Sequence, residues 1–369
     1  MVAAGSLSYE PVGLTRGRPP YNPVVKVFRR LPPPDARRPC ALTIGNFDGV
    51  HRGHQALVAG LVAEARRHGL ASCVLTFEPH PREFFAGKAA AVGAGTALTG
   101  DAAAAAAVQP VRIANLRDKL EALAALGVDR VCVAHFNQSL AATAASDFVT
   151  GILAEGLQAR RLLIGDDFRF GARRSGDFAL LQQIGPPLGI EVQAMPTVIE
   201  DGIRISSSLV REALGAADFA RVAHLLGRPY RLSGRVIHGR KLGRELGFPT
   251  LNLRFPHGRP ALRGVFVVEV QGIAGGGQAL PGVASLGTRP AVEKDGRHLL
   301  EVHLLDWSGD AYGKLARVEF LQKIRDEEHF DSHDALSLEI ASDSKRARAY
   351  FAGRDVAGRV AGCIPGCVP

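Results

Sequence analysis

The sequence predicts two domains of different architecture, a doubly wound parallel α/β sheet followed by a small antiparallel β-barrel. From about Pro39 to Pro196, short apolar runs typical of strands alternate with helical patterns, which is the rhythm of βαβ units. After Gly227 the pattern changes to short strands separated by turns, which favours a barrel. A chain of 369 residues is long enough to bury two separate cores.

The expected elements follow from these patterns. The expected strands of the sheet are Cys40–Ile44, Ser72–Phe77, Arg130–Ala134, Arg161–Ile164 and Glu191–Ala194. The expected helices between them are Gln55–His68, Ile113–Leu126, Ala145–Gly156 and Phe178–Ile184. The expected barrel strands are Arg231–His238, Gly264–Gln271, Gly282–Leu286, Leu299–Leu305 and Ala316–Ile324, followed by one helix at Asp334–Ile340.

These elements divide the chain into segments. We expect a disordered extension over residues 1–34, a first domain over 35–226, a second domain over 227–352 and a disordered tail over 353–369. An Ala-rich insertion at residues 86–108 interrupts the first domain, and we expect no chemistry from it.

The segment Gly45–His54 follows the first expected strand and leads into the first expected helix, with the sequence Gly-Asn-Phe-Asp-Gly-Val-His-Arg-Gly-His. A Gly-rich turn at a helix N-terminus binds anions, because free backbone N–H groups and the positive end of the helix dipole converge there. His51 and His54 share one side of the first helical turn, so both imidazoles can face that anion. Gly53 leaves room for the backbone to approach it. The turn therefore predicts a nucleotide site.

The alternatives for the two histidines are a solvated helix face and a metal site. Zinc is disfavoured, because no third His or Cys lies nearby at a helical spacing.

The His-x-Gly-His core resembles the signature of the nucleotidylyltransferase superfamily. With Gly-x-Phe-Asp-Gly before it, the turn resembles the bacterial FAD synthetases, which are bifunctional riboflavin kinase/FMN adenylyltransferases. The resemblance implies that His51 and His54 stabilise a reacting α-phosphate. It also implies nucleotide contacts at Gly45, Phe47, Asp48, Gly49 and Gly53.

Two further blocks resemble the same family. In Gly165–Gly171, the resemblance ties Asp167 to the flavin ligand or Mg²⁺ and offers Phe168 and Phe170 as stacking surfaces. Two Phe at alternate positions are otherwise typical of a hydrophobic core. The loop Thr76–Pro81 resembles the family's Phe-x-Pro-His-Pro loop, with a rigid structural loop as the alternative role.

The third block, Ile205–Arg211, starts a helix with serines. Ser207 and Ser208 can present hydroxyls to phosphate, and Arg211, one turn further, can reach the same anion. A role in helix capping alone would leave Arg211 unexplained. The family usually has Thr where Ser208 stands, and the hydroxyl is retained.

The second domain carries its own motif, a series of glycines that ends in Gly-Phe-Pro-Thr-Leu-Asn. No Gly-x4-Gly-Lys-Ser/Thr pattern occurs, so this is not a P-loop. The motif resembles that of riboflavin kinases, in which Thr and Asn oxygens hold Mg²⁺ and ATP phosphates. Thr250 and Asn252 match these positions, and the resemblance extends to nucleotide contacts at Gly243, Arg244 and Gly247.

A kinase that phosphorylates a hydroxyl needs a base. Glu301 enters a strand where the family keeps its catalytic Glu, and a solvent-facing strand residue is the alternative. Arg325 matches a family position that would contact the flavin phosphate or ADP.

Composition limits the remaining possibilities. The formal charge of +9 would suit nucleic acid, but arginines are spread along the chain and no basic block interleaved with aromatics occurs. A small anionic ligand such as ATP explains the charge as well, so we expect no nucleic-acid partner. The five cysteines form no Cys-x-x-Cys pair, and no apolar run of membrane length or signal-peptide pattern is present. We therefore expect a cytoplasmic protein without membrane contact.

The resemblance thus implies an enzyme that converts riboflavin to FMN and then to FAD with ATP and Mg²⁺. Another cytidylyl- or adenylyltransferase would use the same histidines, but would not need the barrel motif. A flavin-sensing or nucleic-acid-binding protein on this scaffold is the non-enzymatic alternative. The oligomeric state is left open.

Overall fold

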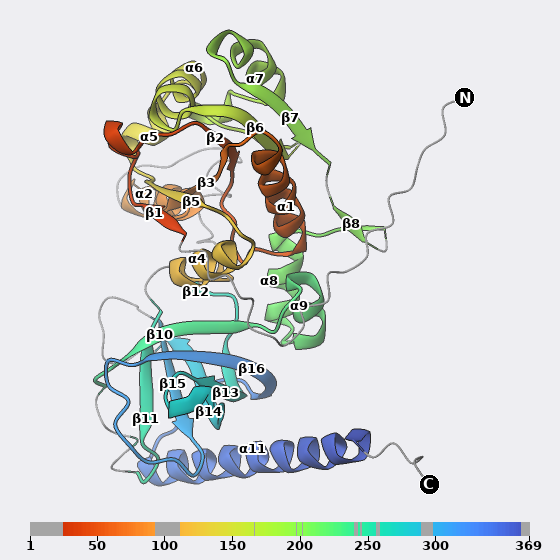
Figure 1. The fold of residues 1–369 in the computed structure, drawn as a ribbon. Coiled ribbons are helices and arrows are strands. Elements are labelled where there is room, and N and C mark those ends of the chain that lie inside the picture. Colours follow the sequence, from red (N-terminus) through yellow and green to blue (C-terminus); the bar gives the residue numbers. More distant parts are fainter. Residues whose placement is uncertain are drawn as a thin grey trace, which may run out of the picture.

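Strand β2 (Cys40–Ile44) is buried at every residue, because it lies inside a parallel sheet covered on both faces. The computed structural model describes residues 25–92, 111–165, 167–196, 198–200, 202–239, 243, 246–255, 259–288 and 298–362. Figure 1 shows the sheet domain at one end of the described structure and the barrel domain at the other end. Most of the Ala-rich insertion lies outside the described residues.

The sheet of the first domain has the order β1-β5-β3-β2-β6-β7, and all its pairings are parallel. The five expected strands are confirmed, with bounds that shift by up to two residues. They are β2, β3 (Ala71–Glu78), β5 (Arg130–His135), β6 (Ala159–Gly165) and β7 (Glu191–Met195). The sixth, β1 (Lys26–Phe28), pairs with β5 at the sheet edge. The expectation of a disordered extension to residue 34 is therefore wrong for this strand, and residues 1–24 lie outside the described range.

Side chains of β2 alternate between two hydrophobic cores, one on each face of the sheet. Cys40, Leu42 and Ile44 join a core with the segment Phe148–Gly156, whereas Ala41 joins a core with helix α1 (Arg52–Arg67). Helices on both faces of a parallel sheet make the doubly wound arrangement that the sequence predicts.

Several helices of this domain begin directly after a side chain that caps them, among them α1, α4 and α8. The expected helix from Ile113 starts instead at Leu116, because the Asn115 side chain accepts a hydrogen bond from Asp118 N, at 2.9 Å. The expected helix Ala145–Gly156 consists of a short α6 (Ala145–Asp147) and a π-helix, η2 (Phe148–Gly156). The other helices are α2 (Pro81–Val92), α4 (Leu116–Ala125), α5 (Gln138–Ala142), α7 (Phe178–Ile184), α8 (Ser207–Gly215) and α9 (Phe219–Leu226). The shorter elements are η1 (Pro34–Ala36), β4 (Val111–Arg112), η3 (Ala172–Arg174), η4 (Pro186–Leu188), β8 (Ile199–Glu200) and β9 (Ile203–Arg204).

The second domain is a closed antiparallel barrel with the strand order β10-β11-β15-β14-β13-β16, as the sequence predicts. Its strands are β10 (Arg231–Ile237), β11 (Thr250–Arg254), β13 (Gly264–Gln271), β14 (Leu280–Thr288), β15 (His298–Leu304) and β16 (Leu315–Arg325). Two short elements, β12 (Arg259–Pro260) and η5 (Gly275–Gly277), lie in its connections.

Helix α11 (His333–Gly362) crosses the end of the barrel that faces away from the sheet domain (Figure 1). It continues well past the expected helix, into the segment that was expected to be a disordered tail from residue 353. Ala347, Tyr350 and Phe351 pack against Val265 and Val283 on the outer face of the barrel, which stabilises the longer helix. Residues 363–369 lie outside the described range.

The two domains share a hydrophobic core. The barrel interior continues into α8, α9 and Ile113 of the first domain. Helix α4 joins the barrel through Asn115 Nδ2, which donates to Ser233 O at 2.8 Å, and Asp118 Oδ2, which accepts from Ser233 N at 3.1 Å. The interface therefore contains buried hydrogen bonds as well as apolar contacts.

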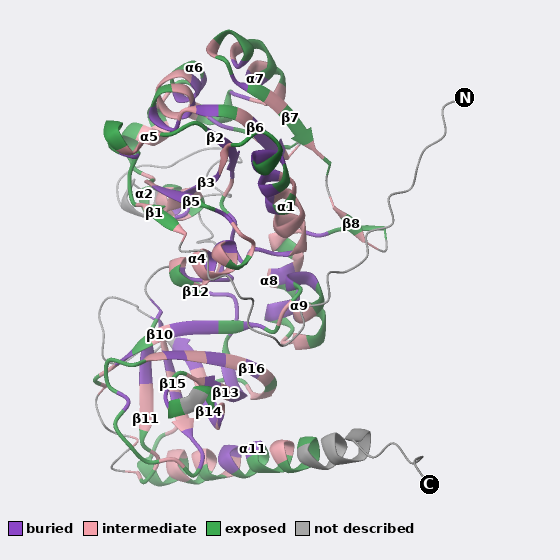
Figure 2. Ribbon diagram, in the orientation of Figure 1, coloured by how far each residue is buried: buried purple, intermediate pink, exposed green. Residues whose placement is uncertain are grey.

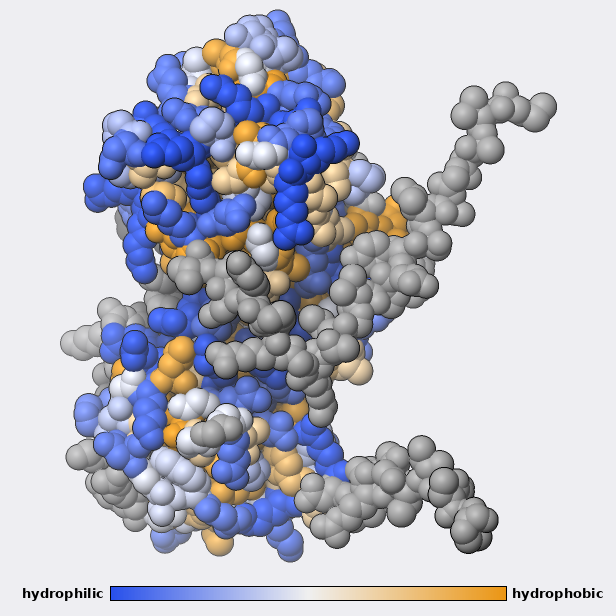
Figure 3. All heavy atoms as spheres, in the orientation of Figure 1, coloured by the Kyte–Doolittle hydropathy of each residue, from blue (hydrophilic) through white to orange (hydrophobic). Residues whose placement is uncertain are grey.

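Burial is concentrated in the strands of both domains (Figure 2). On the face seen in Figure 3, hydrophilic residues cover much of the surface that the structure describes. Within the described residues, none of the helices combines the length and the apolar character needed to cross a membrane.

Candidate active sites

The turn Gly45–His51 lies at the carboxyl end of β2, where doubly wound sheets bind their ligands. Gly49 has a φ of +80°, and a Cβ there would come within 2.6 Å of the Ile113 side chain. At Gly53 a Cβ would lie 3.2 Å from the His51 ring. Both glycines therefore let neighbouring groups close around the turn.

His51 and His54 are brought together by the start of α1. His51 Nδ1 accepts a hydrogen bond from His54 N at 3.3 Å, so His51 caps the helix, and the two rings stack with centroids 3.7 Å apart. His54 Nδ1 is buried without a hydrogen-bond partner among the described residues. The predicted pairing of the two imidazoles is present in the structure.

The surroundings of both histidines are desolvated and positively charged. Burial, followed by the charges of Arg211, Arg204 and Arg228, lowers the pKa of His51 to about 4. Burial, followed by His51, Lys119 and Arg211, lowers the pKa of His54 well below its usual value. Since these positive charges disfavour a protonated imidazole, the site is electrostatically suited to an anion.

Asp48 connects the turn to helix α8 and to the segment before α4. Its carboxylate accepts hydrogen bonds from Ile113 N and Ala114 N, each at 3.2 Å, and from Arg211 Nη2 at 2.5 Å. Ser207 Oγ donates to the Asp48 carbonyl at 3.2 Å. The structure thus gives the Asp48 side chain protein partners, whereas the sequence predicts a nucleotide contact for this residue.

Helix α8 brings two of its three predicted residues to the turn. Arg211 and Ser207 bond to Asp48, and Arg211 Nε also donates to Val111 O at 2.6 Å. Ser208 is exposed on the first turn of α8. Ser206 caps the helix by accepting a hydrogen bond from Leu209 N.

The segment Gly165–Gly171, which was predicted to line the flavin, has an exposed part and a buried part. Asp167 is exposed and pairs with Arg204 on β9 at 2.5 Å, and the charge of Arg204 reaches His51. Phe170 is only 6% exposed, and its ring lies against Phe168 and Phe148. The ring of Phe170 belongs to the hydrophobic core, and Phe168 is half-buried. The predicted flavin stacking of both residues stays a prediction.

Two buried cations at this edge of the sheet were missed at the sequence level. Arg112 binds Glu78 at 2.6 Å and Glu83 at 2.5 Å, and Lys119 donates to Thr76 Oγ1 at 3.4 Å. Neither lies in a recognisable motif, and they come together only through the fold.

The predicted residues of the barrel motif lie on the outer face of two neighbouring strands, β11 and β15. Asn252 on β11 pairs in register with Glu301 on β15, which pairs with Ser285 on β14, and Thr250 pairs with His303. Directly paired residues point to the same face of a sheet, so Thr250, Asn252 and Glu301 share one face. The structure brings these three predicted residues together.

The glycines of the motif allow backbone to cover Asn252, which is only 6% exposed. A Cβ at Gly239 would lie 2.3 Å from Asn252 Nδ2, and one at Gly243 would lie 2.4 Å from Phe248 O. Gly247 has a φ of +84°, and Arg244 lies outside the described residues.

Glu327 and Arg325 lie near the end of β16. Glu327 contacts Ser285 Oγ at 3.5 Å, and burial, with Glu301 as a smaller contribution, raises its pKa. Arg325 binds Asp343 of α11 at 2.8 Å, so its guanidinium holds that helix to the barrel. The predicted contact of Arg325 with flavin or ADP stays a prediction.

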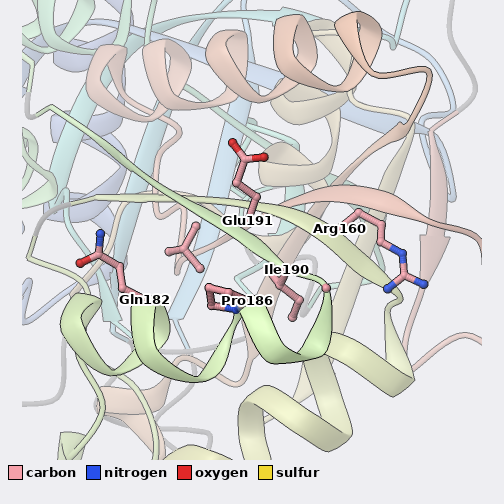
Figure 4. Close-up of a pocket in the computed structure, with 7 residues that line it drawn as sticks. Arg160, Gln182, Pro186, Ile190 and Glu191 are labelled. Carbon is pink, nitrogen blue, oxygen red and sulfur yellow. The ribbon is translucent and has the colours of Figure 1, made fainter.

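Two cavities differ in their relation to these motifs. One, of about 200 Å³, lies beside Thr250 and is also lined by Pro249, Trp307 and Tyr312. Another, of about 450 Å³, lies beside Arg160 and Glu191, near the amino ends of β6 and β7 (Figure 4). Because ligands of such sheets bind at the carboxyl ends, the second cavity is separate from the His51–His54 turn.

A doubly wound sheet with a His-x-Gly-His turn at the carboxyl end of a central strand defines a nucleotidylyltransferase domain, here joined to a barrel with a second phosphate-type motif. Comparison with protein families agrees with both parts. Residues 34–209 match the FAD synthetase family model, and residues 226–351 match the riboflavin kinase model.

Relatives match both domains together. A bifunctional riboflavin kinase/FMN adenylyltransferase from Pseudomonas fluorescens is 47% identical over 315 residues, covering 85% of this chain and 94% of that protein. Its counterpart in Escherichia coli K12 is 45% identical over 312 residues, covering 85% and 93%. The chain belongs to the family of bifunctional riboflavin kinase/FMN adenylyltransferases.

A solved structure supports the fold over most of the chain. A protein from Streptococcus pneumoniae, described as a macrolide-efflux protein, aligns with a TM-score of 0.63 at 26% identity. The alignment covers 88% of this chain and 99% of that one.

Proposed function

We propose that this chain phosphorylates riboflavin to FMN in its barrel domain and adenylylates FMN to FAD at the Gly45–His54 turn. The presence of both family domains in one chain, each with its motif assembled, carries this proposal. The substrates are riboflavin, FMN and ATP.

In the adenylyl transfer, an FMN phosphate oxygen attacks the α-phosphorus of ATP, and the bond to the β-phosphate oxygen breaks to release pyrophosphate. A phosphate dianion is already a nucleophile, so this step needs no general base. The protein supplies positioning and charge stabilisation. The stacked His51 and His54 at the N-terminus of α1 support this role. Arg211, which is bound to Asp48 of the same turn at 2.5 Å, adds a positive charge there.

In the kinase step, a riboflavin hydroxyl attacks the γ-phosphorus of ATP, and ADP leaves. The hydroxyl proton must be removed, and Glu301 is the carboxylate in register with the Thr250–Asn252 motif. We assign Glu301 as this base.

The oxygen atoms of Thr250 and Asn252 fit Mg²⁺, which prefers oxygen ligands and keeps several positions for water and phosphate. Within the part of the chain that the structure describes, no cluster of three or more acidic, His or Cys side chains forms a protein-only metal cage. Bound by Thr250 and Asn252, Mg²⁺ would neutralise charge on the ATP phosphates.

We also propose a cytoplasmic location. Cys40, Cys73 and Cys132 are free and buried, which suits a reducing compartment.

A time course tests the proposal. The purified chain is incubated with riboflavin, ATP and Mg²⁺, and the flavins are separated by chromatography. FMN that appears first and then converts to FAD is the expected result. Riboflavin that remains unchanged would contradict the proposal.

A further inference from the structure

A buried lysine lies beneath the Gly45–His54 turn, which is called the nucleotide turn below. Lys119, on α4, is only 2% exposed, and its ammonium donates to Thr76 Oγ1 at 3.4 Å. Thr76 Oγ1 in turn donates to the carbonyl of Asn46 at 3.2 Å. Since Asn46 belongs to the Gly45–His54 turn, these bonds connect the ammonium to the backbone of the turn.

The positive charge of Lys119 has no ion-pair partner in the described part of the chain. The nearby carboxylates are bound to arginines instead: Asp48 to Arg211, and Glu78 and Glu83 to Arg112. The charges of Asp48, Glu78 and Glu83 favour the ammonium, but burial is the larger effect and lowers its pKa.

A second group at the same edge of the sheet also lacks a partner. His54 Nδ1 is buried and makes no hydrogen bond to any described residue. The charge of Lys119 contributes to the lowered pKa of both His54 and His80, so the ammonium acts on a histidine of the turn, His54. An anion bound at the turn would interact favourably with this charge.

We propose that Lys119 is a positioning residue for adenylyl transfer: its buried ammonium strengthens binding of the ATP polyphosphate and its hydrogen bond supports the backbone of the turn. Lys119 acts from below the turn and does not touch the phosphates. This inference rests on the proposed placement of ATP at the Gly45–His54 turn.

A pH dependence distinguishes this role from a structural one. Burial lowers the pKa of Lys119 to about 8 in the ligand-free chain. The charged and titratable groups that face it come from the turn, α1, β3, the following loop, α2 and β4, and are Asp48, His54, Glu78, His80, Glu83 and Arg112. The ammonium loses its proton as pH rises through this range, so the KM for ATP in FAD formation should increase above about pH 8.

The test is Lys119→Met, assayed as FAD formation from supplied FMN over a range of ATP concentrations. We expect the KM for ATP to rise about tenfold, with kcat changed less than about threefold, because a ground-state electrostatic contribution is removed. In Lys119→Met, the KM for ATP should also stay constant between about pH 7 and pH 9, where that of the wild type rises.

Two controls accompany this variant. Arg117→Met changes an exposed cation on the same helix and should leave the KM for ATP unchanged. Riboflavin kinase activity of Lys119→Met should also be unchanged, which reports on folding because α4 contacts the barrel through Asn115 and Asp118.

A second variant separates the charge from the hydrogen bond. Thr76→Val removes the link to Asn46 but keeps the ammonium, so it should raise the KM less than Lys119→Met and keep the pH dependence.

An unchanged KM for ATP in Lys119→Met, with kinase activity intact, would overturn the proposal, as would a loss of kcat alone with the wild-type pH profile. If Lys119→Met does not fold, the test uses the wild-type chain instead. A KM for ATP in FAD formation that does not rise between pH 7 and pH 9 would then overturn the proposal. The placement of ATP at the turn has a separate test, the His51→Asn/His54→Asn variant. FAD formation at the normal rate in that variant would contradict this placement.

Discussion

The two sites of this chain are built in different ways. At the nucleotide turn, charged and titratable side chains are buried in a network that joins four segments distant in sequence, and Asp48, Lys119 and Arg112 are each at most 4% exposed. On the barrel, Thr250 and Glu301 are half-buried in a row across neighbouring strands. The first site therefore depends on tertiary assembly, whereas the second is set mainly by strand register.

The largest expected effect separates the two activities. In a His51→Asn/His54→Asn variant, FAD formation from FMN should fall about a thousandfold or more, because the groups that stabilise the developing charge are lost. Asn can still cap α1, and riboflavin kinase activity should stay within about twofold of wild type. Chromatographic assays of both steps measure this, and FAD formation at the wild-type rate would remove the histidines from the mechanism.

The reciprocal variant affects the barrel alone. Glu301→Gln should lower FMN formation by about a hundredfold to ten-thousandfold, because a general base is removed, while FAD formation from supplied FMN is retained. Glu328→Gln, at an exposed position near the end of β16, is the matched control and should behave as wild type. Full kinase activity in Glu301→Gln would assign the base to another residue.

A smaller effect tests how far the nucleotide site depends on its buried network. Arg211→Met leaves the buried Asp48 carboxylate without its ion pair and should lower the free energy of unfolding by about 3 kcal/mol. Arg204→Met, which breaks an exposed pair with Asp167, should change stability by less than about 1 kcal/mol. Urea unfolding of both variants gives the comparison, and equal stabilities would show that the buried pair contributes little.

The smallest expected effect is a pH dependence of stability with opposite signs in two regions. At the interface, burial raises the pKa of Asp118 to about 6, so its contribution stabilises the fold below about pH 4 and is lost as pH rises to about 6. At the nucleotide turn, burial lowers the pKa of His51 to about 4, so stability instead rises with pH between about 4 and 6.5.

Asp118→Asn isolates the first of these slopes. Its stability should increase more steeply with pH than that of the wild type between about pH 4 and pH 6, because the opposing contribution of Asp118 is gone. Urea unfolding at several pH values measures the difference. Parallel curves for the two proteins would contradict the raised pKa of Asp118.

The sequence predicts those parts of the molecule that depend on local pattern. The strand, turn and capped helix around His51 were predictable because apolar runs, glycines and histidine spacing are all encoded within about fifteen residues. The Thr250–Asn252 pair was predictable from alternation along one strand. Lys119 and Arg112 were not, since their importance comes from burial beside segments far away in the chain. The partners that Arg325 and Phe170 have in the structure, on α11 and at Phe148, were not predictable for the same reason.

The central claim is that one chain carries two separate sites, one for each step of the proposed function. It is tested by mixing Glu301→Gln with His51→Asn/His54→Asn in the presence of riboflavin, ATP and Mg²⁺. Alone, the first should leave riboflavin nearly unchanged and the second should accumulate FMN. Together they should produce FAD, since each variant supplies the activity that the other lacks. A mixture that accumulates FMN but forms no FAD would contradict the account.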